Sequence, residues 1–188
     1  MKNKEHFNDY SKRALFLHIP KTAGSSMSAA PFILMHGSHK IAPTTEYLLS
    51  LPLRFSFVRN PYDRYASVLL NLGFATPETF EDFTINTFAK EHEKRMKESN
   101  LDWQPLWTMT KRIVFDGKLE VDFVGRFENL QKDWKKVCKV MDYNFPLPHL
   151  NKSKWKGYDQ FYTPRLRSIV SLAYVDDFIR FGYERRWR

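Results

Sequence analysis

The chain has 188 residues, of which 43% are apolar, 16% aromatic and 27% charged, and its single cysteine excludes an intrachain disulfide framework. Sixteen Phe, nine Tyr and five Trp residues supply ample core, which excludes disorder as the main state. No apolar run approaches the roughly 20 residues that span a bilayer. We expect one domain over residues 1–188, with residues 1–13 as a flexible or peripheral segment.

The charge of the chain indicates an anionic partner. Thirty Lys and Arg residues against 21 Asp and Glu residues give a net charge of +9, most of it carried by the second half of the chain. Nucleic acid, acidic polysaccharide and phosphate-bearing cofactors all carry the complementary charge. The charged N-terminus lacks the apolar stretch of a signal peptide, so the expected location is the cytoplasm.

Short apolar runs alternate with amphipathic stretches along the chain. In chain order, the patterns predict a strand (14–19), a helix (25–30), a strand (32–35), a helix (44–49), a strand (53–58), helices (61–72 and 77–97), a strand (121–124) and helices (128–141 and 165–181). This alternation predicts an α/β fold with a mostly parallel central sheet flanked by helices. In such a sheet, ligands bind outside the carboxyl ends of the strands.

The first candidate anion site is the segment HIPKTAGSS, residues 18–26. A strand end, a turn of small residues and a helix N-terminus place several backbone N–H groups around one point, which favours an anion. Lys21 adds a positive charge, and Ser25 and Ser26 add hydroxyl donors. The segment is not the nucleotide P-loop, because its lysine precedes its only glycine. An ordinary capped turn is the alternative interpretation.

The second candidate anion site is the segment VRNPYDRYAS, residues 58–67. Arg59 leaves its strand at the same sheet edge as the first segment, and Ser67 lies about two turns into the following helix, so both can converge above the helix start. A guanidinium fork with a hydroxyl suits a terminal phosphate. A structural ion pair is the alternative, and we expect Asp63 and Arg64 to brace the turn by local pairing.

Together, the two segments indicate a ligand with separated anionic groups at its two ends. A triphosphate concentrates its charge at one end and usually needs a magnesium-binding carboxylate. No predicted strand end carries an Asp that obviously suits this role. We therefore expect no metal.

At these residues the chain resembles a known family. HIPKTAGSS followed by FVRNPYDRYAS is similar to the pair of motifs in sulfotransferases that use 3′-phosphoadenosine-5′-phosphosulfate (PAPS). VDFVGRFENL at residues 121–130 and LPHLNKS at residues 147–153 are also similar to segments of this family. The resemblance is to the carbohydrate (Golgi-type) branch and its bacterial relatives, and it covers about residues 15–183. Four motifs in the right order make it specific.

The resemblance implies a P-loop-like three-layer fold and an enzyme that transfers the sulfuryl group of PAPS to a hydroxyl acceptor, with a carbohydrate as the expected class. Lys21 would bind the oxygen that bridges the sulfuryl group and the 5′-phosphate, offsetting charge that develops as the bond breaks. The residues that would cradle the phosphosulfate are Thr22, Ala23, Gly24, Ser25 and Ser26. Those that would hold the 3′-phosphate are Arg59 and Ser67, and those on a loop closing over the nucleotide are Lys152 and Ser153.

A general base is also implied, because members of the family commonly use a His or Glu on the acceptor hydroxyl. His39 is the first candidate, since HKIA leads into a helix much as the HxTA segment of the family does. A neutral imidazole can accept the hydroxyl proton near neutral pH. His36 is the competitor, and surface loop histidines are the alternative interpretation. A metal site would need more ligands than these two, because Cys138 is distant in the sequence.

For the acceptor, the resemblance points to Trp103, Gln104 and Trp107, where the family has a similar Gln-containing segment. An exposed indole face would stack on a sugar ring, and burial in the core is the alternative. The short region between Leu72 and Trp103 leaves the identity of the acceptor open.

Two clusters of titratable residues are expected to be solvated rather than catalytic. Glu91-His92-Glu93 has no second His at metalloprotease spacing, so a solvated helix face is its expected place. Asp176 and Asp177 are expected at the surface of the last helix.

Two other classes of function remain open on the sequence. The net charge and the aromatic content would also suit a basic nucleic-acid-binding module. However, the most specific basic residues stand singly at strand ends, which favours a small ligand. A nucleotide-dependent kinase is disfavoured by the position of the lysine in the first segment.

Overall fold

The computed structural model describes residues 12–37, 50–148, 150, 155 and 157–186. The chain divides into two compact units, Met1–Val58 with Arg112–Lys152 and Arg59–Lys111 with Ser153–Arg188. Each unit is thus made of two separate stretches of chain. The expectation of one domain over residues 1–188 stays a prediction, and the expected N-terminal segment and the helix over residues 44–49 lie largely or wholly outside the described residues.

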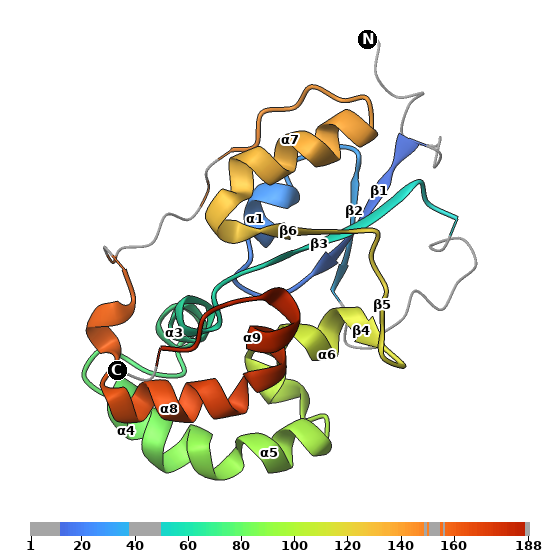
Figure 1. The fold of residues 1–188 in the computed structure, drawn as a ribbon. Coiled ribbons are helices and arrows are strands. Elements are labelled where there is room, and N and C mark those ends of the chain that lie inside the picture. Colours follow the sequence, from blue (N-terminus) through green and yellow to red (C-terminus); the bar gives the residue numbers. More distant parts are fainter. Residues whose placement is uncertain (1–11, 38–49, 149, 151–154, 156, 187–188) are drawn as a thin grey trace. The chain divides into compact units, whose positions relative to one another are not determined.

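The first unit contains a four-stranded sheet of order β2-β1-β3-β6, in which every pair of neighbours is parallel (Figure 1). Its strands are β1 (Ala14–His18), β2 (Ile33–Gly37), β3 (Leu53–Val58) and β6 (Phe123–Arg126). Parallel neighbours need crossover connections, which usually contain helices. The sheet therefore confirms the predicted α/β fold class.

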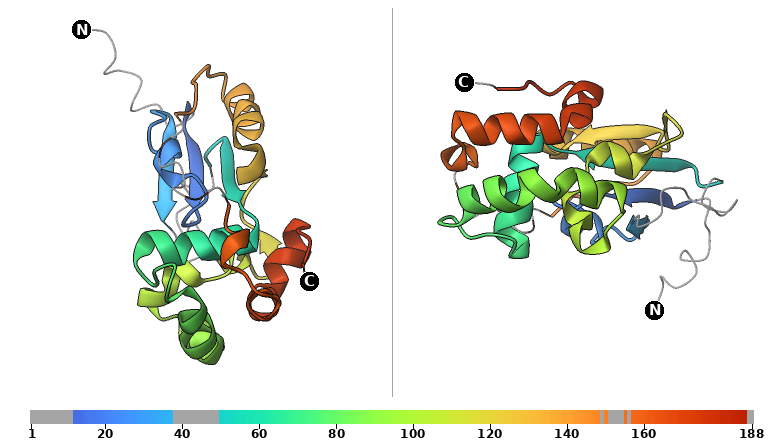
Figure 2. Two further views of the ribbon diagram at one scale, coloured as in Figure 1. Left: turned by 90° about the vertical axis from the view of Figure 1, so that its left-hand side faces the viewer. Right: turned by 90° about the horizontal axis from the view of Figure 1, so that it is seen from below.

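One face of this sheet carries alternating apolar side chains, as the two-residue period of a strand requires. Ala14 and Phe16 of β1 and Phe55 and Phe57 of β3 form a buried cluster with side chains from α1 (Gly24–Met27) and α7 (Leu130–Val140). Figure 2 shows α7 running alongside the strands. Leu15 and Leu17, which point to the opposite face, are buried too. Burial on both faces is typical of parallel sheets in three-layer α/β proteins.

Four further short elements belong to the first unit or to its boundary. A hairpin of β4 (Val114–Phe115) and β5 (Lys118–Leu119) turns at Asp116-Gly117, where both residues have positive φ. The 3-10 turn η5 (Phe127–Asn129) precedes α7. The helix α6 (Met109–Ile113) lies where the chain returns to this unit.

The second unit is helical. Its elements are α3 (Pro61–Leu72), α4 (Phe80–Asp82), the π-helix η3 (Phe83–Phe88), α5 (Ala89–Lys97), the 3-10 helices η4 (Leu101–Leu106) and η6 (Asp159–Phe161), α8 (Pro164–Ala173) and α9 (Val175–Phe181). Helices α5 and α8 contact each other and run side by side in Figure 2. Among the described residues, no helix is long and apolar enough to cross a bilayer.

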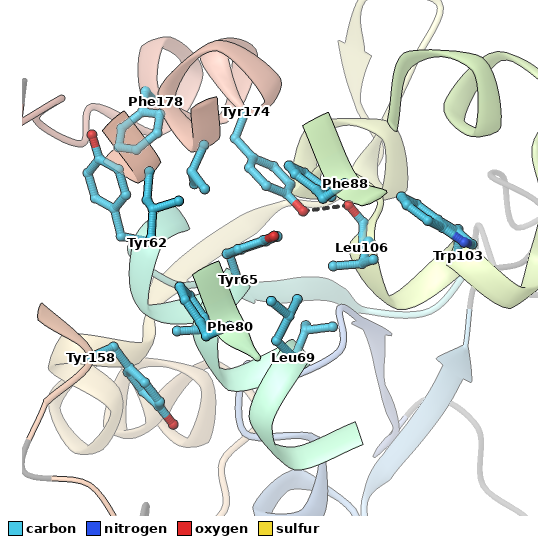
Figure 3. Close-up of a cluster of buried hydrophobic side chains, with 14 residues drawn as sticks. Tyr62, Tyr65, Leu69, Phe80, Phe88, Trp103, Leu106, Tyr158, Tyr174 and Phe178 are labelled. Atoms are coloured by element: carbon cyan, nitrogen blue, oxygen red, sulfur yellow. Dashed lines mark hydrogen bonds between the residues drawn. The ribbon is translucent and has the colours of Figure 1, made fainter. Parts of the chain in front are cut away.

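The core of the second unit is a cluster of aromatic and aliphatic side chains (Figure 3). Tyr65 and Phe88 lie with their ring centroids 4.6 Å apart, and Phe88 and Tyr174 stack at 5.9 Å. The hydroxyl of Tyr174 donates to the carbonyl of Leu106 at 2.7 Å, drawn as the dashed line in Figure 3. Helices from both stretches of the unit therefore share one core.

Candidate active site

The turn that follows β1 has an unusual backbone. Lys21 and Ala23 adopt left-handed conformations with φ of 68° and 75°, although neither is a glycine. Such conformations cost on the order of 1–3 kcal/mol each and concentrate at ligand sites. Ala23 is followed at once by Gly24 in the right-handed first turn of α1. A left-handed residue beside a right-handed one lets successive N–H groups converge into an anion-binding concavity.

The side chains of this turn divide into inward and outward groups. Thr22 is fully buried, and its hydroxyl donates to the carbonyl of Ile19 at 2.7 Å, which holds the turn closed. Ser25 is exposed, and Lys21 is half-buried. No side chain caps α1, since its N-cap residue is Ala23. The turn thus presents backbone donors, Lys21 and Ser25 rather than the hydroxyl of Thr22.

Two of the motifs noted in the sequence meet in the first unit. The hydroxyl oxygen of Ser26 accepts a hydrogen bond from the backbone N–H of Leu150 at 3.4 Å. Leu150 belongs to the LPHLNKS segment, whose Lys152 and Ser153 lie outside the described residues. The contact brings this segment to the first turn of α1.

The two candidate bases differ in what the structure describes. His39 lies outside the described residues. His36 is half-buried on β2, where it pairs in register with Leu17, one position before His18 pairs with Gly37. Because β1 and β2 are parallel, His36 belongs to the same carboxyl edge of the sheet as the turn after β1. Its role as a base stays a prediction.

Arg59 follows β3 directly. Because β3 and β1 are parallel neighbours, their carboxyl ends lie at one edge of the sheet. Within the second unit, Arg59 is only 8% exposed, its backbone N–H donates to the sulfur of Met109 at 3.4 Å, and its guanidinium carbon lies 5.2 Å from the centre of the Tyr158 ring. A guanidinium over an aromatic face is stabilised by the ring quadrupole. Tyr158 was not anticipated from the sequence.

Helix α3 begins immediately after Arg59. Asn60 is its N-cap and accepts the backbone N–H of Tyr62 at 3.0 Å, and Pro61 occupies the first helical position as predicted. Ser67 is buried on this helix, where Asn71 donates to its carbonyl at 2.9 Å and approaches its hydroxyl at 3.4 Å. Arg59 and Ser67 are therefore both held by local structure around the start of α3.

Arg64 does more than brace its own turn. It is 1% exposed, and one of its terminal nitrogens donates to the carbonyls of Pro105 and Trp107, both at 2.8 Å. Its guanidinium carbon lies 5.9 Å from the centre of the Tyr174 ring. Burial lowers the pKa of Arg64 from its usual value. These two bonds reach 41 and 43 residues along the chain, and the expected local pairing with Asp63 stays a prediction.

The expectation that Asp177 lies at the surface is wrong. Its side chain is fully buried and accepts the backbone N–H groups of Met109 at 2.8 Å and Thr110 at 2.7 Å. Burial raises the pKa of this carboxyl group, because the protein interior disfavours its charged form. A signal for this position exists in the sequence: Asp177 lies four residues before Phe181, on the same helical face, and Phe181 is also buried.

The expectation that Glu91-His92-Glu93 lies on a solvated helix face is wrong for His92. Its ring centroid lies 4.6 Å from that of Phe88 and 5.6 Å from that of Tyr174, and its buried Nε2 atom has no hydrogen-bond partner among the residues that the structure describes. Burial lowers the pKa of His92 to about 4. Its neighbour Glu93 is exposed and pairs with Lys97 at 2.6 Å.

The three residues expected at the acceptor lie in and beside η4. Trp103 is 7% exposed and stacks between aromatic neighbours, and Trp107 is 2% exposed. Lys111 lies 4.4 Å above the ring of Trp107. Gln104 is half-buried. The indole faces are packed in the core in this structure, and an acceptor role for the three residues stays a prediction.

Comparison with known families now bears on these residues. A model of the sulfotransferase family matches residues 5–184. The chain belongs to the sulfotransferase family. No curated protein and no solved structure matches the chain.

As a member of this family the protein is a transferase that catalyses sulfation. The match covers the described residues of both candidate anion sites, from the left-handed turn at Lys21 to the helix that carries Ser67. In this sulfotransferase, residues 18–26 around the turn include a lysine and no acidic residue.

Proposed function

We propose that this sulfotransferase transfers the sulfuryl group of PAPS to a hydroxyl of a carbohydrate acceptor, and leaves adenosine 3′,5′-bisphosphate. The observation that carries the proposal is the left-handed backbone of Lys21 and Ala23 at the carboxyl end of β1. Strain of this kind persists only where the surrounding structure maintains it, and it supports a site for the phosphosulfate.

Lys21 acts on the bond that breaks. In the proposed reaction the acceptor oxygen forms a bond to sulfur, while the bond from sulfur to the 5′-phosphate oxygen breaks and leaves its electron pair on that oxygen. The ammonium of Lys21 and the N–H groups of residues 22–25 stabilise this charge as it develops. Residues that fix both ends of the donor also supply orientation.

Arg59 and Ser67 hold the 3′-phosphate in this proposal, and Lys152 and Ser153 contribute to binding the nucleotide, as the resemblance implies. The buried guanidinium of Arg59 is pre-positioned by Tyr158 and by the start of α3, so little side-chain entropy is lost on binding. In α/β sheets ligands bind outside the carboxyl ends of the strands, and the first segment follows such an end at β1, as Arg59 does at β3.

His39 accepts the proton of the acceptor hydroxyl in this proposal, and His36 is the alternative base. The imidazole takes the proton as the oxygen attacks sulfur, so that the acceptor is activated without a full alkoxide. Gln104, Trp103 and Trp107 contribute to acceptor binding. The net charge of +9 supports an acidic saccharide as acceptor.

Replacing Lys21 separates catalysis from binding. We expect Lys21→Ala to lower the turnover number far more than it weakens the bisphosphate complex, because the lysine acts chiefly on charge that develops in the transition state. Transfer of radiolabelled sulfate from PAPS to a desulfated polysaccharide measures turnover, and calorimetry measures binding. Equal turnover in the variant would remove Lys21 from the mechanism.

Replacing Arg59 tests the 3′-phosphate site. Arg59→Ala should weaken binding of adenosine 3′,5′-bisphosphate by about 2–3 kcal/mol, the scale of a lost charge-assisted hydrogen bond. Adenosine 5′-monophosphate, which lacks the 3′-phosphate, should bind both proteins alike. Arg180→Ala, on the exposed face of α9, is the matched control. Unchanged bisphosphate affinity, or salt-dependent retention on DNA with no bisphosphate binding, would contradict the proposal.

A further inference from the structure

The ring of His18 lies against the backbone of Gly24. A β-carbon added to Gly24 would meet the Nε2 atom of His18 at 2.2 Å, its Cδ2 atom at 2.6 Å and its Cε1 atom at 3.0 Å. Real β-carbons essentially never approach other atoms this closely. Gly24 belongs to α1 and does not have a positive φ, so its backbone conformation does not call for glycine. What requires a glycine here is the imidazole ring.

The position of His18 ties this ring to the sheet. His18 is the last residue of β1 and pairs in register with Gly37 of β2, and its ring centroid lies 5.8 Å from that of Phe16. Phe16 is fully buried in the core of the first unit. The ring is therefore anchored by the core on one side and covers the first residue of α1 on the other.

Gly24 directly follows the left-handed pair of the turn. Lys21 and Ala23 would each have a lower conformational energy at negative φ, so other contacts must hold the turn in its observed conformation. The hydrogen bond from Thr22 to Ile19 holds its first half. The packing of His18 on Gly24 holds its second half, where the N–H groups enter α1.

We infer that His18 is a positioning residue for the donor: its ring fixes the backbone N–H groups at Ala23–Ser25 so that they grip the 5′ end of the nucleotide. The inference rests on the proposed function, because it assigns the ligand of the turn as the 5′-phosphosulfate. His18 acts through Gly24 and through shape, and it needs no proton transfer.

A comparison of two nucleotides isolates the contribution of the 5′-phosphate to binding. The ratio of the dissociation constants of adenosine 3′-monophosphate and adenosine 3′,5′-bisphosphate measures what the 5′-phosphate adds. In the unmodified protein the bisphosphate should bind more tightly. We expect Gly24→Ala to lower this ratio about tenfold, because the new methyl group and the His18 ring cannot both stay in place. Binding of the 3′-monophosphate should change little.

The decisive variant is the double substitution of His18→Ala and Gly24→Ala. In a His18→Ala background, Gly24→Ala should cost nothing further in the ratio, since the ring that it meets is gone. His18→Ala alone should lower the ratio several-fold, and His18→Asn, which keeps a polar but shorter side chain, should do the same. Additive effects of the two substitutions, or a ratio that His18→Ala leaves unchanged, would overturn the inference.

Gly125→Ala is the matched control for a general packing defect. A β-carbon at Gly125 would meet the ring of Phe57 at 2.4 Å, an equivalent clash in the sheet of the same unit. It should lower the melting temperature and leave the nucleotide ratio unchanged. A ratio near one in the unmodified protein would instead contradict the proposed function, which is a different result from a normal ratio that His18 does not influence.

Discussion

At the scale of single residues, the second unit buries two groups that usually carry charge. Arg64 and Asp177 are both buried, and both form hydrogen bonds with backbone groups between Pro105 and Thr110. Removing one partner of such a set leaves buried polar atoms without a bond, which is more costly than the bonds themselves are stabilising. These residues fix a stretch that otherwise has only short helical turns.

The buried imidazole of His92 predicts a pH dependence of stability. Its pKa is about 4 in the folded protein, lowered by burial, and about 6.5 when the chain is unfolded. Between these values only the unfolded chain binds the proton, so stability should fall as the pH drops from about 6.5 to about 4, by at most about 3 kcal/mol. Above about pH 6.5 and below about pH 4, His92 should not make the stability depend on pH.

Urea unfolding at several pH values measures this contribution, with His92→Phe as the comparison. Phenylalanine keeps a ring against Phe88 and Tyr174 and cannot be protonated. The variant should lose less stability than the unmodified protein across the window. Parallel pH profiles for the two proteins would show that His92 does not titrate in this way.

Single positions also show what the sequence patterns could and could not predict. The position of the lysine sets the first motif apart from the nucleotide P-loop pattern. Nothing in the motif indicates the left-handed φ at Lys21 and Ala23, because both residue types favour other conformations. Tyr158 under Arg59 is a contact across 99 positions of sequence, and local periodicity carries no information on it.

At the scale of elements, the sequence predicted the bounds of a helix or strand well where the capping residues and the apolar periodicity agreed. The strand over residues 53–58 and the helix over residues 61–72 have the predicted bounds, with Gly73 as a left-handed C-cap. The helix predicted over residues 77–97 instead contains the π-helix Phe83–Phe88 between two α-helical pieces. The helix predicted over residues 165–181 breaks at Tyr174. Tertiary bonds of Thr84 and Tyr174 accompany these departures.

The π-helix gives a prediction of its own. Thr84 is fully buried, bonds the carbonyl of Phe80 at 2.7 Å and lies 3.0 Å from the hydroxyl of Tyr65. Thr84→Val keeps the shape but leaves the Tyr65 hydroxyl without this bond, so the free energy of unfolding should fall by about 1–3 kcal/mol.

The matched test is Tyr65→Phe in both backgrounds. Once Thr84 is Val, removing the Tyr65 hydroxyl should restore part of the lost stability, because the orphaned group is gone. Chemical denaturation of the four proteins completes the cycle. If Tyr65→Phe is equally destabilising in both backgrounds, the two hydroxyls are not coupled.

At the scale of the whole molecule, the two units are interleaved along the chain. The buried cluster of the second unit draws Tyr62 to Leu106 from one stretch and Tyr158 to Phe178 from the other. We expect a fragment of residues 59–111 to be largely unfolded alone, because it lacks Tyr174, which packs against both Tyr65 and Phe88. Circular dichroism should show helix gained when residues 153–188 are added. A fragment that is already helical and cooperatively folded would contradict this dependence.

The sequence predicted the fold class and the order of the strands along the chain, because alternation of strand and helix restricts the possible topologies. It did not predict the division into two units. Such a division depends on which distant stretches share a core, and the pairing of Phe88 with Tyr174 is not encoded in either stretch alone.

This interleaving limits how the enzyme can be re-engineered. The residues proposed for the 3′-phosphate and the acceptor, Arg59, Ser67, Trp103, Gln104 and Trp107, belong to a unit that two separate stretches of chain build. A chimera with a relative would therefore have to exchange residues 59–111 and 153–188 simultaneously. A single crossover would graft half of one hydrophobic core onto half of another.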